Sequence, residues 1–156
     1  MYNKIAKSYD ELYKEEQLNK LRIISKILKV SKNYLLLDLG AGTGISTNYF
    51  NCKCYGIEPS LEMIKHGKGN LINANAENLP FKSKKFDIII AVTSFHNFNN
   101  FDKSISEIKR VSKQKCKIVI TLLKKSKNLE LIKEKLIKNF KMEEINEEKD
   151  LILYLY

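Results

Sequence analysis

Short apolar segments alternate with amphipathic segments along almost the whole chain, and this alternation limits the possible folds more than any other feature. Strands are predicted over residues 34–39, 53–58, 70–73, 85–92 and 116–123. Continuous apolar strands separated by helices are typical of a parallel sheet that is covered on both faces. The pattern therefore predicts a doubly wound α/β fold.

Helical periodicity occupies most of the remaining sequence. Helices are predicted over residues 2–16, 18–29, 43–50 and 60–66, and two more are expected to begin at caps formed by Asp102 and Ser126. The last sixteen residues are typical of two strands with a turn near 147–150, which predicts an antiparallel hairpin at the sheet edge. No linker or repeat divides the chain. We therefore expect one domain over residues 1–156, with N-terminal helices in 1–30 and the core in 34–156.

The composition is that of a protein with one hydrophobic core. The chain has 156 residues, of which 44% are hydrophobic, and it has no apolar run long enough to cross a membrane. The charged first residues do not resemble a secretory signal, so a cytoplasmic location is expected. The three cysteines (Cys52, Cys54 and Cys116) lack metal-ligand spacing and are expected to be free, and no metal site is expected.

The positive charge is concentrated in one part of the chain. The net charge is +10, and the segment between residues 101 and 127 contains nine basic residues and only two acidic ones. Such a segment can attract RNA or another polyanion. The alternative is the solvated surface of a lysine-rich chain, since Arg110 is the only arginine in the segment.

A glycine-rich loop, GAGTG, directly follows the strand at 34–39. Glycines allow a tight turn and the close approach of a ligand, and the carboxyl ends of parallel strands are where ligands bind in such sheets. A phosphate-binding P-loop is excluded because Ile45 and Ser46 follow the last glycine where Lys and Ser or Thr are needed. A dinucleotide fingerprint is excluded because Ile45 occupies the position of its third glycine.

Four stretches, taken in order, resemble the class I S-adenosylmethionine-dependent methyltransferases, in particular their type 11 subset. They are LLLDLGAGTG (35–44), GIEPS (56–60), NANAENLPF (73–81) and KFDIIIAVTSFHNF (85–98). The resemblance extends over nearly the whole chain. It implies a Rossmann-like fold with a mostly parallel seven-stranded sheet, S-adenosylmethionine as cofactor, and methyl transfer as activity.

The resemblance also implies which residues hold the cofactor. Asp38 would orient the glycine loop and the amino end of the methionine, and Glu58 can accept both ribose hydroxyls. Asn75 stands where the family usually has Asp, and its carbonyl oxygen can accept a hydrogen bond from the adenine amino group. The full expected set is Tyr9, Asp38, Gly40, Ala41, Gly42, Gly44, Glu58, Pro59, Asn75, Ala76, Glu77 and Thr93.

Each of these assignments has a purely structural alternative. Asp38 could be a buried helix-capping acid, Glu58 an ordinary carboxylate at a strand end, and Tyr9 a core residue. His96 is the candidate catalytic residue, since it could take a proton from the acceptor, but a loop histidine that shapes the pocket is the alternative. His66, at a helix end, is assigned no chemistry.

The acceptor is expected to be a macromolecule, with RNA ahead of protein, because no lid insertion follows the strand at 116–123. The compact outline is similar to family members that need a small activator protein at a sheet edge. A small-molecule acceptor remains open if the N-terminal helices act as a lid. A cofactor-binding module without catalysis of its own is the other alternative, since Asn75 and Asn97 depart from the family pattern.

Overall fold

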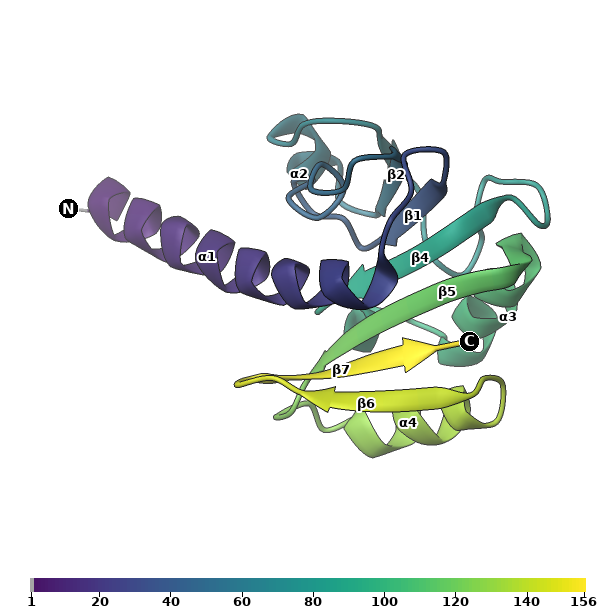
Figure 1. Cartoon of the computed structure of the whole chain (residues 1–156). Helices are drawn as coiled ribbons and strands as arrows, with labels where there is room; N and C mark the ends of the chain where they lie inside the picture. The colour runs from purple at the N-terminus through teal and green to yellow at the C-terminus, as the bar shows by residue number, and fades with distance from the viewer. Residues whose placement is uncertain (1) are drawn as a thin grey trace.

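In the computed structural model (Figure 1), a seven-stranded sheet forms the centre of the protein and helices pack on both of its faces. The structure describes the backbone of residues 2–156 and the side chains of residues 11–156. The strands are β1 (Leu35–Leu39), β2 (Lys53–Glu58), β3 (Leu71–Asn73), β4 (Phe86–Val92), β5 (Ser112–Leu123), β6 (Met142–Asn146) and β7 (Asp150–Leu155). The helices are α1 (Tyr2–Leu28), α2 (Leu61–Lys65), η1 (Phe95–Asn97, a 3₁₀ turn), α3 (Phe101–Val111) and α4 (Leu129–Ile137).

The strand order is β3-β2-β1-β4-β5-β7-β6. The first five strands in this order are parallel, while β7 runs antiparallel to both β5 and β6. The order reverses between β1 and β4, so the chain segments that follow these two strands leave the sheet side by side. This arrangement confirms the predicted doubly wound, mostly parallel fold with its C-terminal antiparallel hairpin.

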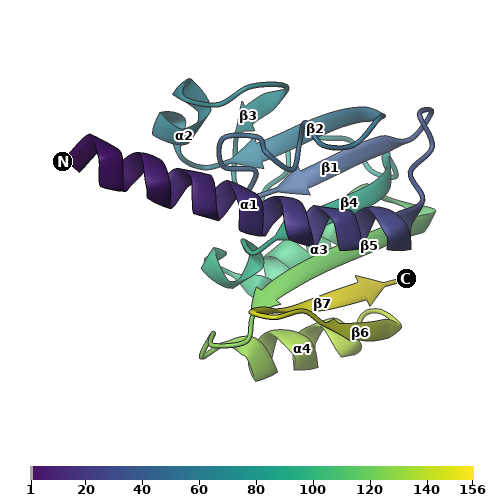
Figure 2. The same cartoon turned by 60° about the vertical axis from the view of Figure 1, so that its left-hand side comes forward.

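Neighbouring residues in the central strands supply two different cores, because successive side chains in a strand point to opposite faces. Leu36 and Ile88 pack under α1, whose residues Leu21, Ile24 and Leu28 are fully buried. On the other face, the cluster under α3 and α4 contains Leu37, Ile89, Ile105, Ile108 and Leu136. Figure 2 shows α1 lying across the sheet face that carries Leu36 and Ile88, with the amino-terminal half of the helix extending past the carboxyl ends of the parallel strands.

The N-terminal region forms one helix, so the prediction of two separate helices was wrong. No glycine or proline occurs between Tyr2 and Leu28, and nothing interrupts the helical hydrogen bonds at residue 17. No helix in the described part of the chain is long and apolar enough to cross a membrane.

The predicted helix over residues 43–50 was also wrong, because this segment forms a series of turns. Its polar side chains bond elsewhere: Ser46 and Thr47 donate to Asp38, and Asn48 donates to the carbonyls of Gly44 and Lys68. Such side-chain bonds compete with the helical ladder.

Two predicted helix caps also differ from the observed ones. The cap of α3 is Asn100, which accepts from the N–H of Lys103, while Asp102 pairs with Lys135 at 2.9 Å. The residue before α4 is Asn128, and Ser126 instead accepts from the Asn128 N–H in the preceding turn. Ser60, in contrast, caps α2 as predicted.

Candidate active site

The glycine loop adopts left-handed backbone angles that other residues rarely reach. Gly40, Gly42 and Gly44 have φ values of +72°, +58° and +95°. A β-carbon on Gly40 would lie 2.4 Å from that of Ser94, so this glycine allows β1 and the end of β4 to approach closely. A β-carbon on Gly42 would meet only the end of Met63, at 3.9 Å. The loop at Gly42 therefore faces open space in which a ligand can lie.

Asp38, at the end of β1, is fully buried and orders the segment after the loop. Its Oδ2 accepts hydrogen bonds from Ser46 at 2.5 Å and from Thr47 at 2.8 Å, while its Oδ1 has no partner among the described residues. Burial raises the pKa of this carboxyl to about 6. Asp38 thus holds the loop directly, and its contact with the amino end of a cofactor stays a prediction.

Glu58, at the end of β2, connects two segments of the site. Its Oε1 accepts from the N–H of Gly42 at 2.9 Å, and its Oε2 accepts from the N–H of Ser60 at 2.8 Å. A carboxylate oxygen has two acceptor positions, so each oxygen keeps one for another donor. The side chain can therefore hold the loop and still accept a pair of hydroxyls.

A cavity of about 230 Å³ opens next to the glycine loop and the end of β2. Five residues predicted from the sequence line it: Gly40, Pro59, Asn75, Ala76 and Glu77. The structure adds four further lining residues, Ile57, Asn97, Phe98 and Asn99, of which Asn97 is one of the two departures from the family pattern.

The Glu77 side chain, at the wall of this cavity, holds a neighbouring backbone segment in place. Its Oε1 accepts from the N–H groups of Asn99 and Asn100, at 2.8 and 3.2 Å, and so fixes the segment that follows η1. Asn75 is exposed and Ala76 is buried, which leaves the side chain of Asn75 accessible to a ligand. Ala41 and Gly44 belong to the loop but do not line the cavity.

Thr93 directly follows β4 and takes part in a buried polar network. Its hydroxyl accepts from Lys20 at 2.8 Å, donates to Asp150 at 2.8 Å, and lies 3.1 Å from the hydroxyl of Thr121. A hydroxyl has one donor and two acceptor positions, and these three partners occupy them all. Cofactor binding by the Thr93 side chain would need one of these bonds to break, and this role stays a prediction.

The sequence did not reveal Lys20 or Asp150 as residues of the site. Lys20 is buried beside the apolar stripe of α1, and only its neighbour Gln17, also buried, hints at a polar environment there. Asp150 is the first residue of the otherwise apolar strand β7 and is completely buried. Their side chains form an ion pair of 3.2 Å.

His96 lies in η1 and is half buried, and its Nδ1 is buried without a partner among the described residues. Burial lowers the pKa of this imidazole, while the charge of Asp150 raises it and that of Lys20 lowers it. A neutral imidazole can accept a proton. His66 is exposed and lies 3.1 Å from Glu62, far from any such environment. Tyr9, the predicted cover of the site, lies outside the residues whose side chains are described.

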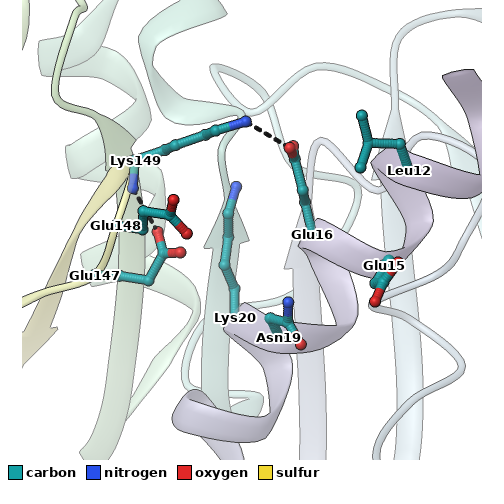
Figure 3. A pocket seen from close by; sticks show the side chains of 8 residues that line it. All are labelled: Leu12, Glu15, Glu16, Asn19, Lys20, Glu147, Glu148 and Lys149. Atoms are coloured by element: carbon teal, nitrogen blue, oxygen red, sulfur yellow. Dashed lines mark hydrogen bonds and ion pairs between the residues drawn. The ribbon is translucent and has the colours of Figure 1, made fainter.

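A second cavity, of about 280 Å³, lies between α1 and the turn that joins β6 to β7 (Figure 3). Lys149 reaches across it from the turn to Glu16 of α1, at 2.6 Å. Lys20 also lines this cavity, so the cavity adjoins the network around Thr93. The other lining residues are Leu12, Glu15, Asn19, Glu147 and Glu148.

The chain is similar in sequence to known methyltransferases. Residues 37–120 match the methyltransferase-domain family, and the chain belongs to that family. An uncharacterised protein of Methanocaldococcus jannaschii is 39% identical over 72% of this chain and 46% of its own length. A demethylmenaquinone methyltransferase of Thermotoga maritima is 29% identical over 77% of this chain and 58% of its own. The chain thus spans about half the length of the relatives that it matches.

Solved structures share the fold. A putative S-adenosylmethionine-dependent methyltransferase of Methanococcus maripaludis superposes with a TM-score of 0.79 at 16% identity, over 96% of this chain and 90% of that one. A putative Haloferax volcanii methyltransferase, in complex with the activator Trm112, superposes with a TM-score of 0.65 at 17% identity, over 75% of this chain and 57% of that one.

The family implies S-adenosylmethionine as the cofactor, and the residues present fit it. The open space at Gly42, the unused acceptor positions of Glu58 and the adjoining cavity suit the methionine, ribose and adenine parts, respectively. The orphaned Oδ1 of Asp38 provides negative charge beneath the loop.

Proposed function

We propose that this domain transfers a methyl group from S-adenosylmethionine to an acceptor bound at the carboxyl edge of the sheet. The observation that carries the proposal is the bond between Glu58 and Gly42, which sets a ribose-binding carboxylate against a glycine loop with open space beside it. Glu58 would hold the ribose hydroxyls and Asn75 and Ala76 the adenine, while the methionine part would lie in the open space beside Gly42. The bound cofactor supplies an electrophilic methyl group on a sulfonium.

His96 is the group that we propose for proton transfer. The acceptor atom bonds to the methyl carbon as the carbon–sulfur bond breaks, and the acceptor must lose its proton to remain neutral. A neutral imidazole whose pKa is lowered by burial can take that proton. The unpartnered Nδ1 of His96 makes a bonding position available at the end of β4.

RNA is the acceptor class that we place first. Lys124, Lys125 and Lys127 are exposed in the loop after β5, at the carboxyl edge of the sheet. The N–H of Lys124 donates to the carbonyl of Lys149, so this loop lies beside the second cavity. Lysines at the mouth of a site can hold a phosphate backbone. Arg110 is not available for this task, because it bonds to Glu107 and to two carbonyls.

A small molecule is the second candidate, and the cavity between α1 and the β6–β7 turn supports it. About 280 Å³ is close to the lower end of the range for small-molecule sites. Four carboxylates line this cavity (Glu15, Glu16, Glu147 and Glu148), and they would repel a phosphate backbone there. The relative from Thermotoga maritima is named for a small-molecule acceptor.

An activator subunit at a sheet edge is part of the proposal. The strand β6 forms one edge, and four of its five residues are exposed. The Haloferax volcanii relative supports a partner of this kind, since it was solved with the activator Trm112.

Incubation with S-adenosylmethionine carrying a labelled methyl group tests the function. The purified chain is mixed with separate RNA, protein and metabolite fractions, with and without a Trm112-type activator. We expect label in RNA. Label only in metabolites would favour the second candidate, while cofactor binding without transfer to any fraction would indicate a module with no catalysis of its own.

A further inference from the structure

Four elements of the fold meet at one buried polar network. Lys20 comes from α1, Thr93 from the position directly after β4, Thr121 from β5 and Asp150 from the start of β7. Lys20 is 4% exposed and Asp150 is 0% exposed. The Lys20 ammonium donates to Thr93 at 2.8 Å and lies 3.2 Å from the Asp150 carboxylate. The network is therefore largely buried, with Lys20 at the wall of the second cavity, and ties α1 to the carboxyl ends of two central strands.

The network holds Thr93 in a strained conformation. Thr93 has φ of +53°, a left-handed angle that a β-branched residue rarely adopts and that costs about 1–3 kcal/mol. Its N–H bonds to both the carbonyl and the hydroxyl of Thr121, and its hydroxyl bonds to three side chains. Thr93 lies two residues before η1, so its backbone angle sets the direction in which η1, with His96, leaves the sheet.

The same two charges act on His96. Among the described residues, Asp150 of β7 and Lys20 of α1 are the charged groups whose fields shift the pKa of the imidazole, in opposite directions. Glu77 lies on the other side of the segment and bonds to Asn99 and Asn100. Both His96 and Asp150 keep one buried atom with no partner among the side chains that the structure describes, Nδ1 and Oδ1, respectively.

We infer that Lys20 and Asp150 are positioning residues of the acceptor site, which fix Thr93 and the η1 turn and set the electric field in which His96 takes the acceptor proton. The presence of an acceptor at this position rests on the proposed function. The electric field at His96 does not depend on it. A buried ion pair is weak evidence for stability alone, because hydrophobic residues of the same volume often serve as well. The pair lies at the carboxyl ends of β4 and β5, and Lys20 also lines the second cavity (Figure 3), so the pair is placed to act on the acceptor site as well as on the fold.

Nuclear magnetic resonance titration of the histidines tests the field directly, without any ligand. The chain has two histidines, so the spectrum is simple, and the exposed His66 serves as an internal reference. Removal of the positive charge in Lys20→Met should raise the pKa of His96. Removal of the negative charge in Asp150→Asn should lower it. A purely structural role would not give shifts of opposite sign.

Lys149→Met is the matched control. It removes a lysine that also lines the second cavity but whose charge is exposed and paired with Glu16, and it should leave His96 unchanged. If one single variant fails to fold, the other still tests the field, because each variant predicts a shift of defined sign.

Kinetics with the labelled acceptor fraction extend the test. In each single variant the rate of transfer should fall by about tenfold or more, since proton transfer by a positioned group is worth roughly 10²–10⁴-fold. The affinity for S-adenosylhomocysteine should stay within about twofold, because neither residue touches the glycine loop. Shifts of the same sign in Lys20→Met and Asp150→Asn, or no shift at His96 in either of these two variants, would overturn the inference. Loss of cofactor binding or transfer in the wild type would instead overturn the proposed function.

Discussion

The Oε1 atom of Glu58 accepts a hydrogen bond from the backbone N–H of Gly42, 2.9 Å away, and so joins the end of β2 to the glycine loop. Glu58→Ala would remove this bond and the expected ribose acceptor together. We expect S-adenosylhomocysteine to bind more weakly by about 1–3 kcal/mol, the scale of hydrogen bonds to charged groups. Isothermal titration calorimetry measures this loss.

Glu62→Ala is the matched control for Glu58. Glu62 lies four residues further on, in α2, and its carboxylate is exposed beside His66. Its removal changes the net charge equally but should leave cofactor affinity unchanged. Equal affinities for wild type and Glu58→Ala would mean that the cofactor does not contact this carboxylate.

Gly42→Val should abolish cofactor binding and leave most of the fold intact. The added side chain would enter the open space beside the loop, and the left-handed angle of +58° resists a β-branched residue at a cost of about 1–2 kcal/mol. Gly40→Ala should behave differently, since its β-carbon would collide with Ser94 and lower the melting temperature further. Thermal unfolding and calorimetry on both variants separate the two effects. Tight binding by folded Gly42→Val would place the ligand elsewhere.

Asp38→Asn should change how the free energy of unfolding depends on pH. Burial raises the folded-state pKa of Asp38 from 3.8 to about 6, so the folded state holds this proton more tightly than the unfolded state does. The contribution of the Asp38 carboxyl to the free energy of unfolding is therefore fully present below about pH 4. It is lost as the pH rises through about 6. The loss amounts to about 3 kcal/mol for a shift of about two pKa units.

The variant lacks this titration. Relative to wild type, Asp38→Asn should therefore gain up to about 3 kcal/mol between pH 4 and pH 7. Urea denaturation at several pH values measures the difference. A constant difference across this range would show that the carboxyl is not titrating inside the fold.

RNA binding, if it occurs as proposed, should depend on the loop after β5. Reversal of Lys124, Lys125 and Lys127 to Glu should weaken RNA binding, and wild-type affinity should fall steeply with salt because phosphate contacts release counterions. Cofactor affinity should not change. Filter binding over a salt series measures both effects.

A control with the same change of charge comes from the opposite edge of the sheet. Lys82, Lys84 and Lys115 are exposed near the amino ends of β4 and β5. Their reversal to Glu should weaken RNA binding much less. Equal losses in the two triple variants would indicate general attraction to a basic surface, and RNA binding that is indifferent to salt would contradict the proposal.

The sheet was predictable because the hydrophobic residues of its strands show, in the sequence itself, that these strands are buried. The apolar run in β4 can only be covered on both faces, and the hydrophobic pattern of β1 and β2 has the same cause. The glycine loop was predictable for a similar reason, since three glycines after a strand imply backbone angles that other residues avoid. These features depend on local sequence alone.

The turns after the glycine loop and the network at Thr93 were not predictable in this way. The segment at 43–50 has helical spacing, but its polar side chains bond to Asp38 and Lys68, which are distant or buried partners. Lys20 and Asp150 are 130 residues apart, and an isolated lysine on a helix usually faces solvent. Only the packing of α1 against β7 brings the pair together.

Calorimetric titration of the wild-type chain with S-adenosylhomocysteine, and separately with NAD, shows which cofactor the glycine loop and Glu58 bind. The glycine loop, Ile45 at the position of the missing third glycine, and the Glu58 carboxylate together predict saturable, one-to-one binding of S-adenosylhomocysteine and no heat from NAD. Tight binding of NAD, with no response to S-adenosylhomocysteine or S-adenosylmethionine, would contradict the account.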